Sequence, residues 1–183
     1  MIFGRLERVV EPSPMRREAE CPVFGSCGGC HLQHLSYEDE MKVKRESILE
    51  DLERIGKTKA DFRRVVPCPE RYGYRNHALF KVDAERRPGF LMRESDTLVP
   101  FPPQGCLLLP EEMRKEIAAI PPEAFEPLTE VRVRMDKFGA VHFWGLLDRM
   151  GPPEVLMEAG GFMFPVNHDS FFQVNRFLAT PLV

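Results

Sequence analysis

Three cysteines within ten residues constrain this chain more than any other feature of its sequence. Cys21, Cys27 and Cys30 have the spacing C-x5-C-x2-C, and Gly28 and Gly29 separate the last pair. Glycines let a backbone wrap closely around a large ligand and turn its amide N–H groups towards sulfur. The segment therefore predicts a metal-binding loop that supplies three thiolates.

A 4Fe–4S cluster needs four thiolates, so one more must come from Cys68 or Cys106, and spacing alone does not choose between them. Five cysteines in a chain without an export signal argue against a disulfide framework. Zinc sites commonly use two C-x2-C pairs, and only one such pair occurs here. We expect a 4Fe–4S cluster, with zinc or ordinary buried thiols as the alternatives.

Composition limits the class of protein. The 25 Lys and Arg against 28 Asp and Glu give a net charge of −3, so any RNA-binding surface must be a local patch rather than a global positive field. A hydrophobic content of 43% is enough for a folded core. No stretch approaches the roughly 18 apolar residues that would span a bilayer, and the N-terminus does not have the pattern of a signal peptide. We expect a cytoplasmic protein with no membrane partner.

The hydrophobic pattern predicts short helices and strands separated by proline-rich loops. Residues 2–10 are expected to form a single strand. The clearest helix extends from Tyr37 to about Ile55, and Ser36 and Asp39 have the pairing of a capping box at its start. Its apolar face is expected to cover a core. A further helix is expected to begin after Ser170 and to be cut by the end of the chain.

From about residue 72 the alternation of apolar and polar residues predicts a series of short strands. They are YGYRNHALFKV, RPGFLMR, TLVPF, VRVRM, AVHFWGLL and a strand near Phe162, with a helix at about 111–120 among them. VRVRM and AVHFWGLL flank the turn DKFG and are typical of a hairpin. We expect Arg132 and Arg134 on its solvent-exposed face and Trp144 in the core.

Four segments in order resemble the iron–sulfur branch of the uracil-5-methyltransferases, which use S-adenosylmethionine on ribosomal and transfer RNA. They are CPVFGSCGGCHLQHLSYEDEMKVK, YGYRNHALFKV, RPGFLMRESDTLVPFPPQGCLLLP and FPVNHDSFFQVN. The resemblance implies an α+β fold: an iron–sulfur loop with its helix and a small mixed β-domain, followed by the start of a Rossmann-like methyltransferase domain. It divides the chain into the last strand of a β-barrel RNA-binding domain with a linker (1–15), the iron–sulfur loop and helix (16–60), a central mixed α/β RNA-recognition domain (61–160) and the truncated start of the methyltransferase domain (161–183).

The same resemblance implies roles for individual residues. Cys106, in GCLLLP, becomes the fourth cluster ligand, and Cys68 becomes the spare cysteine. Gln173 corresponds to a glutamine that contacts S-adenosylmethionine, and Phe171 could stack near the base or the cofactor. Without the resemblance, the FFQVN stretch is more often a helix cap and core contact.

In the family a cysteine thiolate adds to carbon 6 of uracil, carbon 5 takes the methyl group, and a carboxylate base removes the surplus proton. The family's nucleophilic cysteine, its base and its glycine-containing cofactor loop fall beyond Val183. We therefore assign no catalytic residue to this chain and expect the chain alone not to transfer methyl groups.

RNA, ribosomal according to the resemblance, is the expected partner. Tyr74, Arg75, Asn76 and His77 combine an aromatic ring, a cation and an amide, a mixture that suits single-stranded RNA, although a strand with one solvated face explains them equally well. Arg16, Arg17 and His34 flank the cysteine loop in sequence and could contact phosphates. Two other functions stay open: a non-enzymatic RNA-binding iron–sulfur module and a small electron carrier.

Overall fold

The computed structural model describes residues 7–183 and divides the chain into two compact units. The first consists of the residues up to Glu20 together with His31–Pro67, and the second of Cys21–Cys30 together with Cys68–Val183. The cysteine loop therefore belongs to the second unit, whereas the helix that follows it in sequence belongs to the first. Most of the strand expected at 2–10 lies outside the described residues, and residues 7–10 form no strand.

Helix α1 (Tyr37–Arg54) of the first unit begins where its sequence predicts. The hydroxyl of Ser36 accepts the backbone N–H of Asp39 at 2.9 Å and donates to the Asp39 carboxylate at 2.6 Å. This contact satisfies one of the N–H groups that a helix start leaves without an intrahelical partner. The expectation that α1 covers a core is wrong for the described residues, because none of its side chains is buried and Ile48 is 48% exposed.

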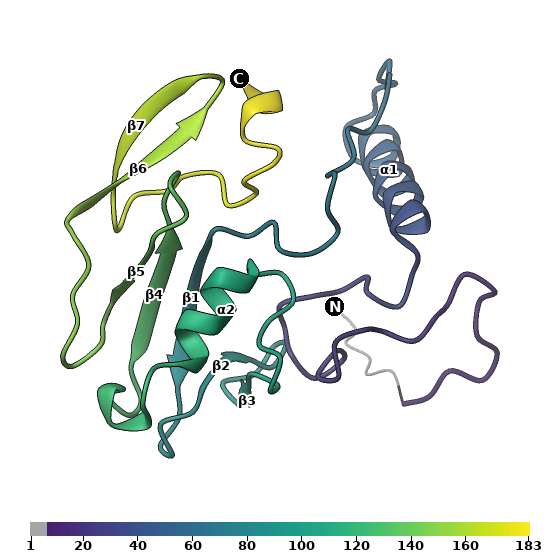
Figure 1. Cartoon of the computed structure of the whole chain (residues 1–183). Helices are drawn as coiled ribbons and strands as arrows, with labels where there is room; N and C mark the ends of the chain where they lie inside the picture. Colours follow the sequence, from purple (N-terminus) through teal and green to yellow (C-terminus); the bar gives the residue numbers. More distant parts are fainter. Residues whose placement is uncertain (1–6) are drawn as a thin grey trace. The chain divides into compact units, whose positions relative to one another are not determined.

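The second unit contains a five-stranded antiparallel sheet with the order β3-β2-β1-β4-β5 and a separate hairpin of β6 and β7 (Figure 1). The predicted hairpin around DKFG is confirmed as β4 and β5. Strand β6 was not expected from the sequence. The strands are β1 (His77–Val82), β2 (Pro88–Leu91), β3 (Leu98–Pro100), β4 (Glu130–Met135), β5 (Val141–Trp144), β6 (Glu154–Ala159) and β7 (Phe162–Asn167).

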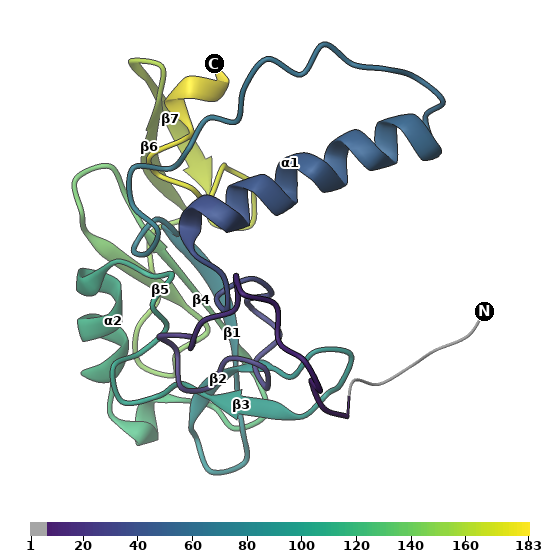
Figure 2. The same ribbon diagram turned by 90° about the vertical axis from the view of Figure 1, so that its right-hand side faces the viewer.

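The main core lies between one face of the sheet and helix α2 (Glu111–Ala118), which runs alongside the strands in Figures 1 and 2. Strand β1 alternates, so that Ala78, Phe80 and Val82 point to this core and the residues between them do not. Met113 and Ile117, one helical turn apart on α2, complete it. A short 3-10 helix at Pro122–Ala124 then leads the chain to β4.

The opposite face of the sheet is polar around Arg132 and Arg134, and this part of it is not open to solvent as the sequence suggested. Arg134 is fully buried, which corrects the expected solvent exposure of this residue. Its guanidinium donates to the backbone carbonyl oxygens of Asn167 at 3.2 Å and Ser170 at 2.8 Å. Arg132 is half-buried and forms an ion pair with Asp169. The segment after β7 therefore covers this part of the face and accepts hydrogen bonds from the two arginines.

A second, smaller hydrophobic cluster joins the hairpin of β6 and β7 to β5. Trp144 is buried, as predicted, against Val155, Met157 and Val166. The indole also stacks on the imidazole of His168, with ring centroids 5.5 Å apart. The contacts fix the start of the segment that crosses the polar face of the sheet.

The helix expected after Ser170 is absent from the described C-terminal segment, which contains only a 3-10 helix at Thr180–Leu182. Its backbone is instead used in pairing: the N–H of Asn76 donates to the carbonyl of Val174, and the N–H of Arg176 to that of Tyr74. Helical turns begin only after Asn175, whose side-chain oxygen accepts the N–H groups of Phe177 and Leu178. Extended pairing along 174–176 therefore delays the helical turn by several residues.

We expect Arg134→Met to lower the free energy of unfolding by about 2 kcal/mol, because the backbone carbonyl groups of Asn167 and Ser170 lose their donor while most of the side-chain volume is kept. Arg132→Met, which removes a partly exposed ion pair, should cost about 1 kcal/mol or less. Urea denaturation of both variants measures the difference. A variant at position 134 that is as stable as the wild type would mean that burying the charge costs as much as its hydrogen bonds contribute.

Candidate functional site

The candidate site is built on the loop Cys21–Cys30, which is folded into tight turns against the end of β2. The N–H of Phe24 donates to the carbonyl of Cys21 at 3.0 Å, and that of Cys27 to the carbonyl of Val23 at 2.9 Å. Cys27 also forms an antiparallel bridge with Met92, just after β2. The local sequence thus turns the chain back on itself, and the bridge fixes the loop to the sheet.

Gly28 is required for this contact. Its N–H donates to the carbonyl oxygen of Leu91 at 2.9 Å, and a Cβ atom at this position would lie 2.9 Å from that same oxygen. Because real Cβ atoms do not approach a carbonyl oxygen this closely, any other residue would push the loop away from β2. The next amide, that of Gly29, donates to the sulfur of Cys27 at 3.4 Å, as the sequence suggested for these glycines.

Cys106 belongs to the same unit and lies between β3 and α2. Burial raises the pKa of its thiol to about 11, and the neighbouring thiols of Cys30 and Cys27 add to the increase. The backbone N–H groups of Leu108 and Leu109 act in the opposite direction and favour the thiolate. Three of the four predicted ligands therefore lie close enough to influence one another electrostatically.

The five cysteines are thiols rather than disulfides. Within residues 7–183, no group of three or more His, Cys, Asp or Glu side chains is placed so that it could hold a metal ion. Cys68, the spare cysteine, is buried, and its thiol exchanges hydrogen bonds with the side-chain amide of Asn175 at 3.4 and 3.6 Å. It thus has a structural partner at a distance in sequence, as an ordinary buried cysteine would.

The four residues expected to meet RNA lie at the start of β1 and differ in exposure. Tyr74 and Arg75 are half-buried, and Asn76 is only 5% exposed. The Arg75 Nε donates to the carbonyl of His77 at 3.0 Å. His77 faces Arg134 across the β1–β4 pairing, and its Nε2 atom is buried without a hydrogen-bond partner among the described residues.

The other expected contacts are divided between the units. Arg16, Arg17 and His34 belong to the first unit, where the N–H of Arg17 donates to the carbonyl of His34 at 2.8 Å. Both arginines are exposed, and burial together with the charge of Arg16 lowers the pKa of His34. In the second unit Gln173 is exposed and Phe171 is 79% exposed, so both side chains are accessible to a ligand.

Sequence reasoning missed two features of the second unit. One is the buried guanidinium of Arg134, for which strand alternation alone suggested solvent. The other is an apolar pocket beside Cys106, lined in part by Phe101 and Arg114. In the sequence, the prolines that line the pocket indicated only where helices and strands would be interrupted. The pocket itself could not be predicted, because its walls come from segments that meet only in the folded chain.

No protein-family model matches the chain. An RNA methyltransferase of Aquifex aeolicus, itself uncharacterized, is 31% identical over 209 aligned positions, which cover 92% of this chain and 48% of that protein. This chain is therefore similar to RNA methyltransferases along most of its own length. It spans about half the length of that relative.

Two further similar proteins have names that state the reaction they catalyse. The 23S rRNA (uracil(1939)-C(5))-methyltransferase RlmD of Pseudomonas entomophila is 33% identical over 126 positions, covering 66% of this chain and 27% of that protein. The crystal structure of the tRNA (uracil-54, C5)-methyltransferase of Pyrococcus abyssi, in complex with S-adenosyl-L-homocysteine, has a TM-score of 0.65 and 20% identity, and covers 96% of this chain and 51% of that one. The second match shows a shared fold. No helix among the described residues is long and apolar enough to cross a membrane.

The lowered pKa of His77 leads us to expect that the free energy of unfolding depends on pH. Burial, together with the charges of Arg134, Arg132 and Arg75, lowers its pKa to about 4, whereas an unfolded histidine has a pKa of about 6.5. The unfolded chain therefore binds the proton first, and the stability from neutral His77 is complete above about pH 6.5 and is lost as the pH falls towards 4.

Urea denaturation between pH 7 and pH 4.5 measures this effect. His77→Asn should flatten the decrease in stability, and His31→Asn, at an exposed position, should follow the wild-type curve. Parallel curves for His77→Asn and the wild type would show that this histidine does not contribute.

Proposed function

We propose that this chain is the substrate-recognising part of an S-adenosylmethionine-dependent RNA (uracil-C5)-methyltransferase that acts on ribosomal RNA. The observation that carries the proposal is the similarity to RNA methyltransferases along 92% of the chain, with 33% identity to a 23S rRNA uracil-C5-methyltransferase over 66% of it. The similarity in fold to a tRNA uracil-C5-methyltransferase supports the same chemistry and leaves transfer RNA as the alternative substrate.

The proposed reaction explains which groups belong on this chain. Carbon 5 of uracil is a poor nucleophile until a thiolate adds to carbon 6, and a base must later remove the proton from carbon 5. We assign neither the nucleophile nor the base to the described residues. Cys68 is a poor candidate for the nucleophile, because it is buried and its thiol exchanges hydrogen bonds with the side-chain amide of Asn175.

Gln173 and Phe171 are proposed to form the edge of the cofactor site, and S-adenosylmethionine supplies the methyl group when it is bound there. A carboxamide offers both a donor and an acceptor, which suits the amino acid part of such a cofactor. The exposed ring of Phe171 offers a flat surface for an aromatic group. Because the segment 167–170 is held by Arg134, the start of this edge is fixed to the sheet.

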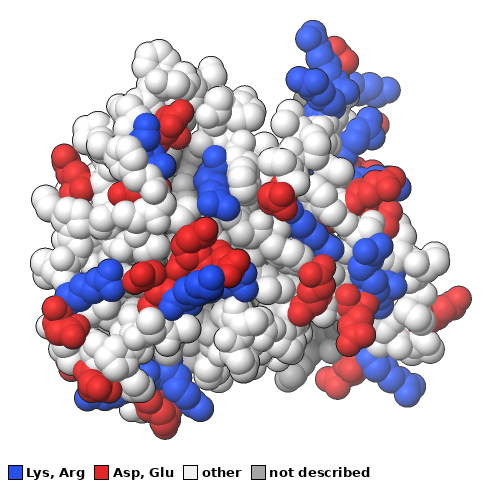
Figure 3. Space-filling view, in the orientation of Figure 1, with Lys and Arg blue, Asp and Glu red and all other residues white. Residues whose placement is uncertain are grey.

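RNA contacts are proposed at the start of β1 and in the first unit. Tyr74, Arg75 and His77 supply an aromatic ring, a cation and an imidazole, while the burial of Asn76 restricts it to holding the backbone in place. Arg16, Arg17 and His34 are proposed phosphate contacts, supported by the exposure of the two arginines. Any positively charged surface is a local patch, because Lys and Arg side chains are interspersed with Asp and Glu on the face of the molecule seen in Figure 3.

A 4Fe–4S cluster is proposed on Cys21, Cys27, Cys30 and Cys106. Four thiolates are the donor set that such a cluster takes, and amide N–H groups directed at sulfur, as from Gly29, are typical of its binding loops. The thiol of Cys106 has a pKa of about 11, so it would ionise near neutral pH only with a strong positive partner. When bound, the cluster would join the cysteine loop to the segment before α2 and so stabilise both.

Cys106→Ser tests the cluster. Wild-type protein purified without oxygen should contain about four irons and four sulfides per chain and absorb visible light, and the variant should lose at least half of both. Cys68→Ser, which removes the cysteine outside the proposed set, should keep the full content. Stoichiometric zinc, or metal content unaffected by Cys106→Ser, would contradict the cluster.

The proposed RNA substrate can be tested in cells from which the gene for this protein has been deleted. We expect mass spectrometry to find one 5-methyluridine missing from ribosomal RNA and restored by the wild-type gene, with Gln173→Ala restoring it at least tenfold more slowly. Loss of the modification from transfer RNA alone would favour the alternative substrate. Unchanged 5-methyluridine in both RNAs would contradict the proposed activity.

A further inference from the structure

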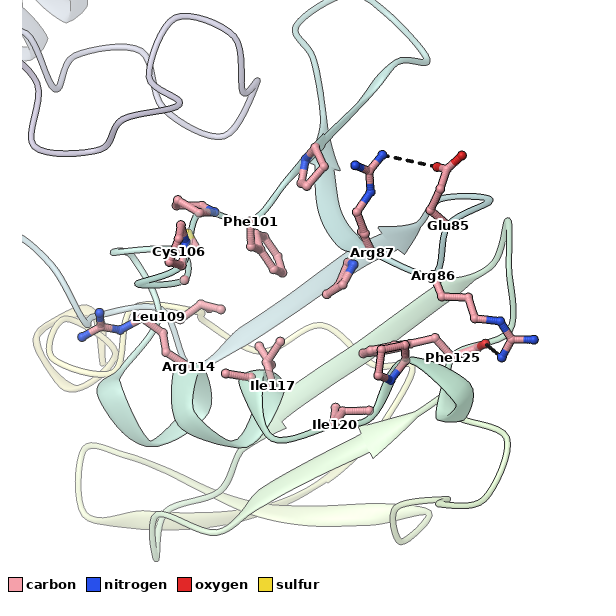
Figure 4. A pocket seen from close by; sticks show the side chains of 17 residues that line it. Glu85, Arg86, Arg87, Phe101, Cys106, Leu109, Arg114, Ile117, Ile120 and Phe125 are labelled. Carbon is pink, nitrogen blue, oxygen red and sulfur yellow. Dashed lines mark hydrogen bonds and ion pairs between the residues drawn. The ribbon is translucent and has the colours of Figure 1, made fainter.

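An apolar pocket opens between the loop after β1, the loop after β3 and helix α2. Its volume is about 310 Å³, near the lower end of the range for small-ligand pockets. Five prolines and two phenylalanines contribute to its walls, and Figure 4 shows Phe101, Ile117 and Phe125 around the central space. Among the walls, the ring of Phe101 is only partly buried, so a ligand can contact it. A pocket of this size and lining suits one flat aromatic group.

The ends of the pocket are positively charged. Figure 4 shows Arg114 at one end and Arg86, Arg87 and Glu85 at the other. Arg87 and Glu85 form an ion pair at 3.3 Å and so offset each other. Arg86 donates to the backbone carbonyls of Glu123 and Phe125, and within residues 7–183 no carboxylate pairs with it.

Arg114 is the cation best placed to serve a ligand. One of its terminal nitrogens donates to the carbonyl of Gln104 at 3.0 Å, and its Nε atom is buried without a hydrogen-bond partner in the described part of the chain. The side-chain stem packs on Gly105, whose φ of +73° and lack of a Cβ leave room for it. The described carboxylates form no ion pair with this guanidinium, so its charge is available to an anion.

We propose that this pocket binds one unpaired nucleobase of the RNA, with its phosphate held by Arg114. Apolar walls with an accessible aromatic ring stack on any base, and an arginine beside them neutralises the phosphate of the same nucleotide. An apolar peptide would also fit the walls, but it would leave the cation at the end unmatched. The inference deepens the proposed function and rests on its RNA substrate.

The first test fills the pocket from its mouth. Ala118 lines the pocket and is exposed, whereas Ala119, also exposed, does not line it. The probe is a fluorescein-labelled, 12-nucleotide single-stranded RNA, compared with an oligomer of the same length whose sugars carry no bases, and affinity is measured by anisotropy. Wild type and Ala119→Phe should bind the RNA about tenfold more tightly than the base-free oligomer, and Ala118→Phe should lose this preference.

Arg114→Gln gives an independent test that leaves the pocket open, with Lys115→Gln as the matched control on the exposed side of α2. Removing the phosphate contact should weaken RNA binding about threefold to tenfold and reduce the slope of log K against log salt concentration by about 0.7. The control should change neither. Equal RNA binding by both Ala variants and by both Gln variants would overturn the nucleobase site and favour a peptide occupant, while the RNA function would stand. A wild-type protein that binds neither oligomer would refute the RNA function itself.

Discussion

The close approach of Gly28 to the end of β2 is the contact on which the candidate site depends. The backbone N–H of Gly28 donates to the carbonyl oxygen of Leu91, and this contact is possible only because Gly28 has no side chain. The cysteine loop therefore belongs to the unit that contains the sheet, whereas the residues on either side of it in sequence belong to the first unit. That attachment brings the thiols of Cys27 and Cys30 within electrostatic reach of Cys106, which is supplied by a distant loop. The backbone geometry of this contact therefore accounts for the clustering of the three thiols.

The sheet separates two kinds of chemistry. One face is packed with aliphatic and aromatic side chains against α2, and the other carries arginine and histidine under the segment that follows β7. A guanidinium that is buried without a carboxylate partner among the described residues is costly unless backbone carbonyls satisfy it. The two terminal nitrogens of Arg134 meet that requirement with Asn167 and Ser170, whereas its Nε atom has no hydrogen-bond partner among the described residues. The two contacts specify the course of the chain towards Phe171 and Gln173.

Local signals in the sequence predicted local structure well. The capping contact between Ser36 and Asp39 and the hairpin around DKFG depend on residues close in sequence, and both are confirmed. The errors came from contacts between distant segments. Strand alternation identified the side of the sheet on which Arg134 lies but not the segment that covers it, and helix propensity after Ser170 could not anticipate that Tyr74 and Asn76 would pair with that backbone. The spacing of the cysteines was enough to predict a loop. The pocket could not be predicted in this way, because it forms only where α2 and two proline-containing loops meet.

Cys106 occupies a position with an energetic consequence. Its side chain belongs to the proposed set of cluster ligands, and the same residue lines the proposed nucleobase pocket. Two ligands that share one residue are thermodynamically linked, and the linkage is reciprocal: any factor by which the cluster tightens RNA binding is the factor by which RNA tightens retention of the cluster. An iron–sulfur centre placed in this way would make substrate affinity sensitive to oxidative damage and iron supply, even if it never exchanges an electron.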